Sequence, residues 1–269
     1  MGNTAPHQAR KRFGQHFLHD QHIIARIVSA IAPVENDNLL EIGPGQGALT
    51  FPLLAQCKQL IAVELDRDLI PILQRSAAKY GVLDIINCDI LEFDLNALAE
   101  VSGLQYRIAG NLPYNISTPL MFHLMASVSH IRDMHFMVQK EVALRIVANV
   151  GDKNYGRLSI MMQYYCQCEY LFDVPPQSFT PPPKVDSAII RLIPHPQPII
   201  EVNDFELFAL IVKTAFGQRR KTISNSLKKM IDPSCFEAAQ IDRSLRAECL
   251  TSEDFARLTN AKLNQDSND

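Results

Sequence analysis

The sequence predicts an open α/β fold followed by a small helical domain, and three observations support this prediction. From about residue 38, short apolar runs alternate with segments of helix length, which is typical of a parallel sheet with crossover helices. The glycine-rich turn from Gly43 to Gly47 follows the first of these runs. A proline-rich break at residues 194–198 then separates this alternation from a stretch whose pattern is helical throughout.

The candidate strands are apolar runs at residues 38–42, 60–64, 83–87, 106–109, 134–138, 170–174 and 185–192. Candidate helices between them span residues 48–56, 67–79, 119–127, 140–150 and 156–167. The proline-dense segment 174–184 is expected to be an extended loop. Beyond the break we expect helices at 204–216, at 218–230 and from Thr251, where Thr251 and Asp254 form a capping pair. The predicted domains are therefore residues 1–197 and 198–269.

Composition and charge narrow the class of protein. The 269 residues are 47% hydrophobic and 20% charged, with a net charge of −3, so binding to a nucleic acid must depend on local basic clusters. The six cysteines form no C-x-x-C pair and no metal-ligand spacing, and we expect reduced thiols and no metal. Apolar runs stay well short of the ~20 residues of a membrane span. We therefore expect a cytoplasmic protein without a membrane partner.

The glycine turn predicts a ligand site at the end of the first strand. Gly43 and Gly45 leave room for a sharp bend and for close approach of a ligand to the backbone. The turn alone leaves the ligand open, because Gly43, Gly45 and Ala48 also fit the dinucleotide pattern, with Glu64 near the expected ribose-binding position. Nicotinamide and flavin cofactors are thus an alternative at this stage.

Three acids favour a cofactor that contains adenosine but no pyrophosphate. Glu41 directly precedes the glycines, Glu64 ends the second strand and Asp89 follows the third. A carboxylate at the position of Glu64 can bind both ribose hydroxyls, and one at Asp89 can accept from an adenine amino group. S-adenosylmethionine has these groups without the phosphate charge. Each acid has a plainer alternative, namely a solvated helix start, a turn cap or a surface residue.

The segment Asn111-Leu112-Pro113-Tyr114 predicts the chemistry. The Asn111 side-chain oxygen and the Leu112 carbonyl can both accept hydrogen bonds from an amino group, and Pro113 stiffens the segment. Tyr114, together with Phe179 in the proline-rich loop, offers faces on which a flipped base can stack. These residues suit methylation of an exocyclic amine on a nucleobase, although each aromatic ring alone is more often part of a core.

Two basic clusters are candidates for phosphate contacts. Six basic residues and no acid lie between Lys213 and Ile231, namely Lys213, Arg219, Arg220, Lys221, Lys228 and Lys229. A second cluster is Arg10, Lys11 and Arg12. Such runs are often just solvated surfaces, but here we expect binding to RNA that weakens steeply with salt. The expected contacts are the second cluster together with Arg219, Arg220 and Lys221 in the helical domain.

Longer runs of the sequence closely resemble the ribosomal RNA adenine N6-dimethyltransferases. The matching runs are residues 11–18 (KRFGQHFL), 41–47 (EIGPGQG), 64–68 (ELDRD), 110–119 (GNLPYNISTP), 179–187 (FTPPPKVDS) and 216–222 (FGQRRKT). The likeness extends from about residue 10 to residue 260 and is strongest to the enzymes that act on the small subunit. It implies a Rossmann-like S-adenosylmethionine-dependent methyltransferase sheet with a small α-helical C-terminal domain.

The resemblance also implies an activity and site residues. The activity is dimethylation of N6 on two adjacent adenosines near the 3′ end of small-subunit (16S) ribosomal RNA, by a monomer with a role in ribosome biogenesis. The implied cofactor contacts are His16, Leu18, Gly43, Gly45, Glu64, Asp89 and Asn111, and the implied surroundings of the target base are Asn111, Leu112, Tyr114 and Phe179. His16 departs from the family, which commonly has asparagine there, and the alternative is that only its backbone touches the ligand.

Two rival functions share many of these features. The large-subunit adenine methyltransferases have the same glycine turn and a similar Asn-Leu/Ile-Pro-Tyr run, and mapping the modified nucleotide would separate the two. The chain would alternatively act mainly as an assembly factor that binds an immature small subunit, with methylation as a release step. A catalytically inactive variant that stalls particles would reveal that role.

Overall fold

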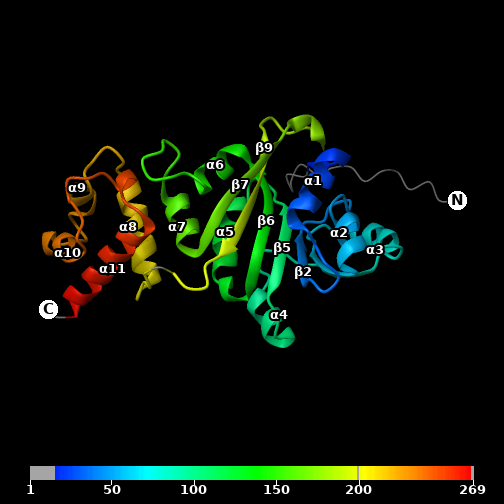
Figure 1. Ribbon diagram of the computed structural model, residues 1–269, viewed down its shortest axis with the longest axis horizontal. Helices are drawn as coiled ribbons and strands as arrows, with labels where there is room; N and C mark the ends of the chain where they lie inside the picture. The colour runs from blue at the N-terminus through cyan, green and yellow to red at the C-terminus, as the bar shows by residue number, and fades with distance from the viewer. Residues whose placement is uncertain (1–15, 199, 268–269) are drawn as a thin grey trace. The chain divides into compact units, whose positions relative to one another are not determined.

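The computed structural model describes residues 16–198 and 200–267, which fold into two compact units (Figure 1). Within that range the first unit comprises the chain up to Ala143 and Glu169–Pro194, and the second comprises Leu144–Cys168 and the chain from His195 onward. The sequence predicted a division at residue 197. The structure differs in one respect, because residues 144–168, assigned above to the first domain, group with the C-terminal residues.

The main sheet has seven strands in the order β4-β3-β2-β5-β6-β9-β7. They are β2 (Leu39–Ile42), β3 (Gln59–Val63), β4 (Val82–Ile86), β5 (Tyr106–Asn111), β6 (Ile131–Gln139), β7 (Cys166–Val174) and β9 (Ser187–Pro194). Strands β2 to β6 pair in parallel, whereas β9 is antiparallel to β6. Each strand coincides, within a few residues at either end, with an apolar run in the sequence, and the predicted α/β fold is confirmed.

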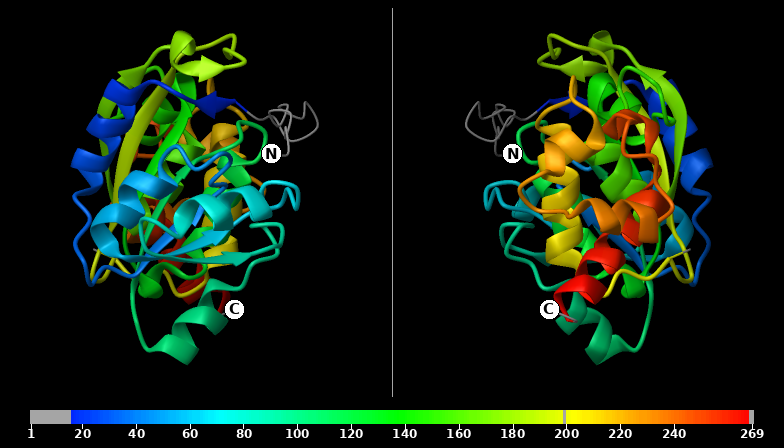
Figure 2. Two further views of the ribbon diagram at one scale, coloured as in Figure 1. Left: turned by 90° about the vertical axis from the view of Figure 1, so that its right-hand side faces the viewer. Right: turned by 90° about the vertical axis from the view of Figure 1, so that its left-hand side faces the viewer.

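Helices cover both faces of this sheet. They are α1 (Gln21–Ile31), α2 (Thr50–Cys57), α3 (Ile70–Ala77), α4 (Leu95–Ser102) and α5 (Ser117–Met125), with α6 (Lys140–Ile146) after β6. The chain moves from β2 to β4 in one direction along the sheet and from β4 to β6 in the other, so right-handed crossovers place α2 and α3 on one face and α4 and α5 on the opposite face. In the left view of Figure 2, the light-blue and cyan helices α2 and α3 face the viewer.

Helix α1 was not predicted, yet its sequence explains it. The Asp20 side chain accepts hydrogen bonds from the backbone N–H groups of His22 and Ile23, which caps the helix N-terminus. Its apolar residues then recur on one face and pack with α2 into the core on one side of the sheet: Ile23, Ile24, Ile27, Val28 and Ile31. Ahead of α1, β1 (Phe17–Leu18) pairs with β8 (Phe179–Thr180), so the N-terminal segment joins the proline-rich loop.

The second unit is helical, with α7 (Arg157–Tyr165), α8 (Phe205–Phe216), α9 (Ile223–Leu227), α10 (Pro233–Ala238) and α11 (Ser252–Asp266). The capping pair at the start of α11 is confirmed, because Thr251 and Asp254 each accept from the other's backbone N–H. The predicted helix 218–230 is confirmed only at its centre, where α9 lies, and is wrong on either side. Residues 218–221 form a turn, Thr222 caps the short α9 and bridges to Arg246, and the chain leaves the helix before Asp232.

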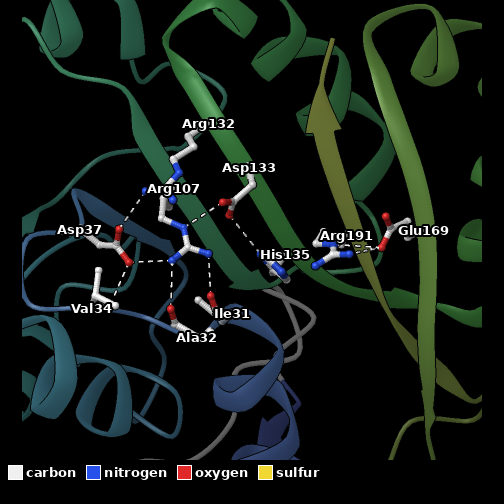
Figure 3. A network of polar contacts seen from close by, with 10 residues as sticks. All are labelled: Ile31, Ala32, Val34, Asp37, Arg107, Arg132, Asp133, His135, Glu169 and Arg191. Atoms are coloured by element: carbon white, nitrogen blue, oxygen red, sulfur yellow. Dashed lines mark hydrogen bonds and ion pairs between the residues drawn. The ribbon is translucent and has the colours of Figure 1, made fainter. Parts of the chain in front are cut away.

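A buried polar network ties α1 to β5 (Figure 3). Arg107, near the start of β5, donates to the carbonyl oxygens of Ile31 (2.6 Å) and Ala32 (3.4 Å) at the end of α1. Its guanidinium also pairs with Asp37 (2.6 Å) and Asp133 (2.9 Å). The side chains of Arg107, Asp37 and Asp133 are 10%, 3% and 13% exposed, so this arginine neutralises two carboxylates away from water.

Candidate active site

A cavity of about 380 Å³ opens in the first unit where four parallel strands end. Its walls come from the segments that follow or end β2, β3, β4 and β5, together with β1. The strand order changes direction between β2 and β5, and crevices at such points are where open α/β sheets bind ligands. The volume lies within the range of small-molecule sites.

The glycine turn forms the floor of this cavity. Gly43 and Gly45 have φ angles of +64° and +57°, which an L side chain rarely adopts, so the predicted need for glycine is confirmed at both positions. Across the strands, a Cβ atom added to Gly110 would lie 2.7 Å from the Ile42 carbonyl oxygen. The backbones of β2 and β5 therefore lie too close together beside the cavity for a side chain at position 110.

Glu64 is held in place by the turn itself. Its Oε2 accepts from the Gly45 N–H at 3.2 Å and its Oε1 from the Asp66 N–H at 2.8 Å. The residue is buried and lines the cavity, and burial raises the pKa of its carboxyl despite these two donors. The carboxylate is thus fixed in orientation, as required of a group that binds two neighbouring hydroxyls.

Glu41 and Asp89 also line the cavity, in different environments. Glu41 is 2% exposed, and its Oε2 has no hydrogen-bond partner among the described residues. Burial, with a further contribution from the charge of Glu64, raises the pKa of Glu41 to about 8. Asp89 is half-buried and its Oδ1 accepts from the Leu91 N–H at 2.9 Å, so this acid caps a turn and faces the cavity at once.

Asn111 ends β5, and one hydrogen bond orients its amide. Its Nδ2 donates to the His16 carbonyl oxygen at 3.1 Å, which leaves Oδ1 on the other side of the amide as an acceptor. Leu112 follows with its N–H bonded to the Met137 carbonyl at 3.1 Å. Both residues line the cavity, so the structure brings the two predicted amine acceptors to the same end of it.

Tyr114 lies beside them with its ring held at two points. The hydroxyl is 2.7 Å from the Ser187 hydroxyl. The ring stacks on the His16 imidazole with centroids 5.7 Å apart and planes inclined by 28°. Partial burial raises the pKa of the Tyr114 hydroxyl, so it stays protonated near neutral pH.

Phe179 requires a correction. Its side chain was expected beside the flipped base, but the residue is 2% exposed, belongs to the core on the α1 side of the sheet and is absent from the cavity wall. The cause is the pairing of β8 with β1, which places Phe179 opposite Leu18. Leu18 itself is buried yet contributes to the cavity wall. The structure therefore favours the packing alternative for Phe179.

Sequence reasoning missed several apolar contributors to the wall, among them Phe17 and Ile90. Phe17 lies over the glycine turn, since a Cβ atom on Gly45 would come within 3.3 Å of its ring. Ile90, directly after Asp89, is buried and contributes an apolar side chain to the cavity wall. The signal for both was their position next to residues already singled out.

The predicted RNA-binding residues lie partly outside the described residues. This applies to Arg10, Lys11 and Arg12. In the second unit, Arg219 pairs with Glu248 at 3.3 Å and donates to the carbonyl oxygens of Lys153 and Tyr155 at the same distance. The six basic residues between Lys213 and Ile231 are all exposed. Arg219 thus anchors its own turn, and its neighbours Arg220 and Lys221 form no ion pair within the described part of the chain.

Across residues 16–198 and 200–267, no three His, Cys, Asp or Glu side chains gather closely enough to hold a metal ion. No helix in those ranges combines the length and apolar character needed to cross a lipid bilayer.

Comparison with known proteins decides the family. The family model described as ribosomal RNA adenine dimethylase matches residues 6–263. The chain belongs to the ribosomal RNA adenine dimethylase family. Curated members include proteins named ribosomal RNA small subunit methyltransferase A. The one from Saccharophagus degradans is 54% identical, covering 96% of this chain and 97% of the relative, and the one from Coxiella burnetii is 51% identical, covering 93% and 96%.

Solved structures agree with this membership. A dimethyladenosine transferase from Plasmodium falciparum is 27% identical with a TM-score of 0.80, covering 94% of this chain and 98% of that one. The 23S rRNA methyltransferase ErmE is 24% identical with a TM-score of 0.72, covering 91% and 98%, and this likeness shows the fold alone. The Rossmann-like methyltransferase fold predicted for this family member is therefore confirmed.

Proposed function

We propose that this chain transfers methyl groups from S-adenosylmethionine to N6 of two adjacent adenosines near the 3′ end of small-subunit (16S) ribosomal RNA. The observation that carries the proposal is the orientation of Asn111. Its Nδ2 is engaged by the His16 carbonyl, so Oδ1 and the neighbouring Leu112 carbonyl remain as acceptors for an amino group at the end of the cavity. The relatives at about 50% identity, all named for the small subunit, support this RNA as substrate rather than the large-subunit RNA.

The residues of the cavity fit an adenosyl cofactor. Glu64 presents a carboxylate fixed by two backbone N–H groups, suited to ribose hydroxyls, and Asp89 lines the same cavity with a carboxylate that can accept from an adenine amino group. Glu41 supplies a buried oxygen that has no hydrogen-bond partner among the described residues and that a donor on the ligand can occupy. When bound, S-adenosylmethionine supplies a methyl group on a positively charged sulfur. Family membership and these acids both disfavour the nicotinamide alternative.

The chain's own groups act on the amine. The N6 nitrogen of adenine is a weak nucleophile because its lone pair is delocalised into the ring. Acceptors at Asn111 Oδ1 and the Leu112 carbonyl hold the two N–H groups so that the lone pair points out of the ring plane. Tyr114 supplies an aromatic face on which the base stacks. Catalysis in this scheme depends on positioning, and the residues named need no metal.

An uncharged asparagine also suits a second transfer to the same nitrogen. The monomethylated amine retains a single N–H, so one acceptor loses its partner during the second reaction. Leaving a neutral oxygen unpaired in a partly buried site costs less than leaving a carboxylate unpaired. We expect Asn111→Asp to accumulate monomethyladenosine, whereas the parent chain proceeds to dimethyladenosine.

The test supplies labelled S-adenosylmethionine with small subunits that lack these methyl groups, and maps the modified nucleotides by mass spectrometry. We expect dimethyladenosine on two adjacent small-subunit adenosines, no label in large-subunit RNA, and loss of turnover in Asn111→Ala. Label in large-subunit RNA would support the rival substrate, and no label in either RNA would contradict the proposal. A role in ribosome biogenesis, as a monomer in the cytoplasm, is part of the proposal. Accumulation of immature particles upon expression of Asn111→Ala would support it.

A further inference from the structure

The two parts of His16 face different neighbours. Its backbone carbonyl accepts from Asn111 Nδ2, whereas its imidazole lies against Tyr114 and the proline-rich loop. The imidazole Nδ1 is 2.7 Å from the Pro181 carbonyl oxygen, and since a carbonyl can only accept, Nδ1 carries the proton. The ring is therefore held at one edge and stacked on one face.

This arrangement determines how Tyr114 is presented to the cavity. The Tyr114 hydroxyl is 2.7 Å from the Ser187 hydroxyl, and one face of its ring is covered by His16. Tyr114 lines the cavity and is half-buried, so its ring keeps exposed surface besides the face that His16 covers. Without the imidazole, the phenol ring would keep its hydroxyl contact but lose the support that limits its rotation.

We propose that the His16 imidazole is a positioning residue of the target-adenine subsite, which backs Tyr114 so that the opposite face of the tyrosine ring receives the base. This inference depends on the proposed function, since it concerns the base that is methylated. It differs from the role implied by family resemblance, where position 16 contacts the cofactor, because an asparagine at this position has no ring to place against Tyr114. The backbone carbonyl of His16 orients the Asn111 amide, and its imidazole supports the Tyr114 ring on which the base stacks.

Two substitutions separate the ring from its tether to Pro181. His16→Phe keeps an aromatic ring but removes the donor to the Pro181 carbonyl, and His16→Asn keeps a donor but removes the ring. Aromatic pairs contribute ~0.5–1.5 kcal/mol, so we expect His16→Asn to lower kcat/KM for unmethylated small subunits roughly 3- to 10-fold. We expect His16→Phe to stay near the parent value. His22→Ala, at an exposed position on α1, is the matched control.

Binding of S-adenosylmethionine is measured in the same variants by calorimetry without RNA. All of them keep the backbone carbonyl that contacts Asn111, so we expect the Kd for the cofactor to change by less than about twofold. A double-mutant cycle then tests the partner. In a Tyr114→Leu background, adding His16→Asn is expected to cause no further loss of kcat/KM, because the ring that His16 supports is already gone.

Any of the following results would overturn the inference: an equal loss from His16→Asn in both backgrounds, cofactor binding that weakens in step with activity, or His16→Phe as impaired as His16→Asn. Thermal melting of each variant shows whether a loss reflects unfolding. A parent chain that methylates small subunits while His16→Asn does so equally well sinks this inference and leaves the proposed function intact. A parent chain without activity on small subunits removes the proposed function instead.

Discussion

Replacing Arg107 by methionine removes the cation at the centre of the buried network while keeping a side chain of similar length. Asp37 then keeps a hydrogen bond from the Val34 N–H and a contact with the exposed Arg132, whereas Asp133 keeps only its contact with His135 within the described residues. Both carboxylates lose their main compensating charge in a site closed to water.

The expected loss follows from burial. Breaking a buried pair by removing one partner costs about 3–5 kcal/mol, because the other partner is left as an uncompensated charge. The carbonyl oxygens of Ile31 and Ala32 lose their donor as well. We expect the free energy of unfolding to fall by about 3–5 kcal/mol, a large part of the ~5–15 kcal/mol of a typical domain.

The assay is guanidinium unfolding followed by far-UV circular dichroism at neutral pH. Arg132→Met is the matched control, since the Arg132 side chain is 62% exposed and its contact with Asp37 is 3.2 Å, so its loss should cost at most about 1 kcal/mol. A loss of less than about 1 kcal/mol in Arg107→Met, or an equal loss in both variants, would refute the reasoning.

The same network predicts a pH dependence. Burial acts to raise the pKa of Asp133, but its contacts with His135 and Arg107 outweigh burial and hold that pKa below the usual value. A carboxyl with a lowered folded-state pKa contributes stability that is present above its unfolded pKa of about 3.9 and is lost as pH falls through the folded pKa. We therefore expect the difference in unfolding free energy between the parent chain and Arg107→Met to narrow below about pH 4.

Three further predictions concern the cavity and the basic turn. Glu64→Ala should weaken binding of S-adenosylmethionine about 10- to 100-fold in calorimetry, the equivalent of losing hydrogen bonds to a charged group; unchanged affinity would remove Glu64 from the site. The pKa of Glu41 is raised to about 8, mainly by burial, so the free energy of unfolding of the parent chain should fall as pH rises from about 4.5 to 8. In Glu41→Gln that fall should be smaller, and denaturant unfolding measured across this pH range would check it. A double Arg220→Ala, Lys221→Ala variant should reduce the slope of log affinity for small subunits against log salt by about 1 to 2, and an unchanged slope would count against phosphate contacts there.

The strands were predictable because each buried strand of a parallel sheet is a nearly continuous apolar run. Helix α1 was equally legible in principle, with Asp20 as cap and apolar residues at helical spacing, but it precedes the glycine turn from which the alternation was followed. The break in the predicted helix 218–230 was harder to foresee. It depends on a bridge between Thr222 and Arg246, and pairing between residues so far apart in the chain leaves no local pattern.

In the candidate site, too, features set by local sequence patterns were predictable, and features set by pairing of distant residues were not. Gly43, Gly45, Glu64 and Asn111 were predictable because a turn after a strand and the ends of neighbouring parallel strands necessarily meet at one edge of the sheet. The burial of Phe179 was not, since an aromatic residue in a proline-rich loop reads the same whether it packs inward or outward. Only the pairing of β1 with β8, across some 160 residues of sequence, decides its direction.

Strand β5 is hydrogen-bonded to residues 16–31 at two places. Arg107, near the start of β5, donates to the Ile31 carbonyl at the end of α1, and Asn111, at the end of β5, donates to the His16 carbonyl. Residues 16–31 are therefore attached to β5 near both of their ends. Each residue in a helix adds 1.5 Å of rise and about 100° of rotation. A single insertion or deletion within α1 would shift and rotate one end of the helix, so that one of these two hydrogen-bonded contacts could form only if the other were lost. Substitutions on the exposed face of α1 should therefore be tolerated far better than any change in its length.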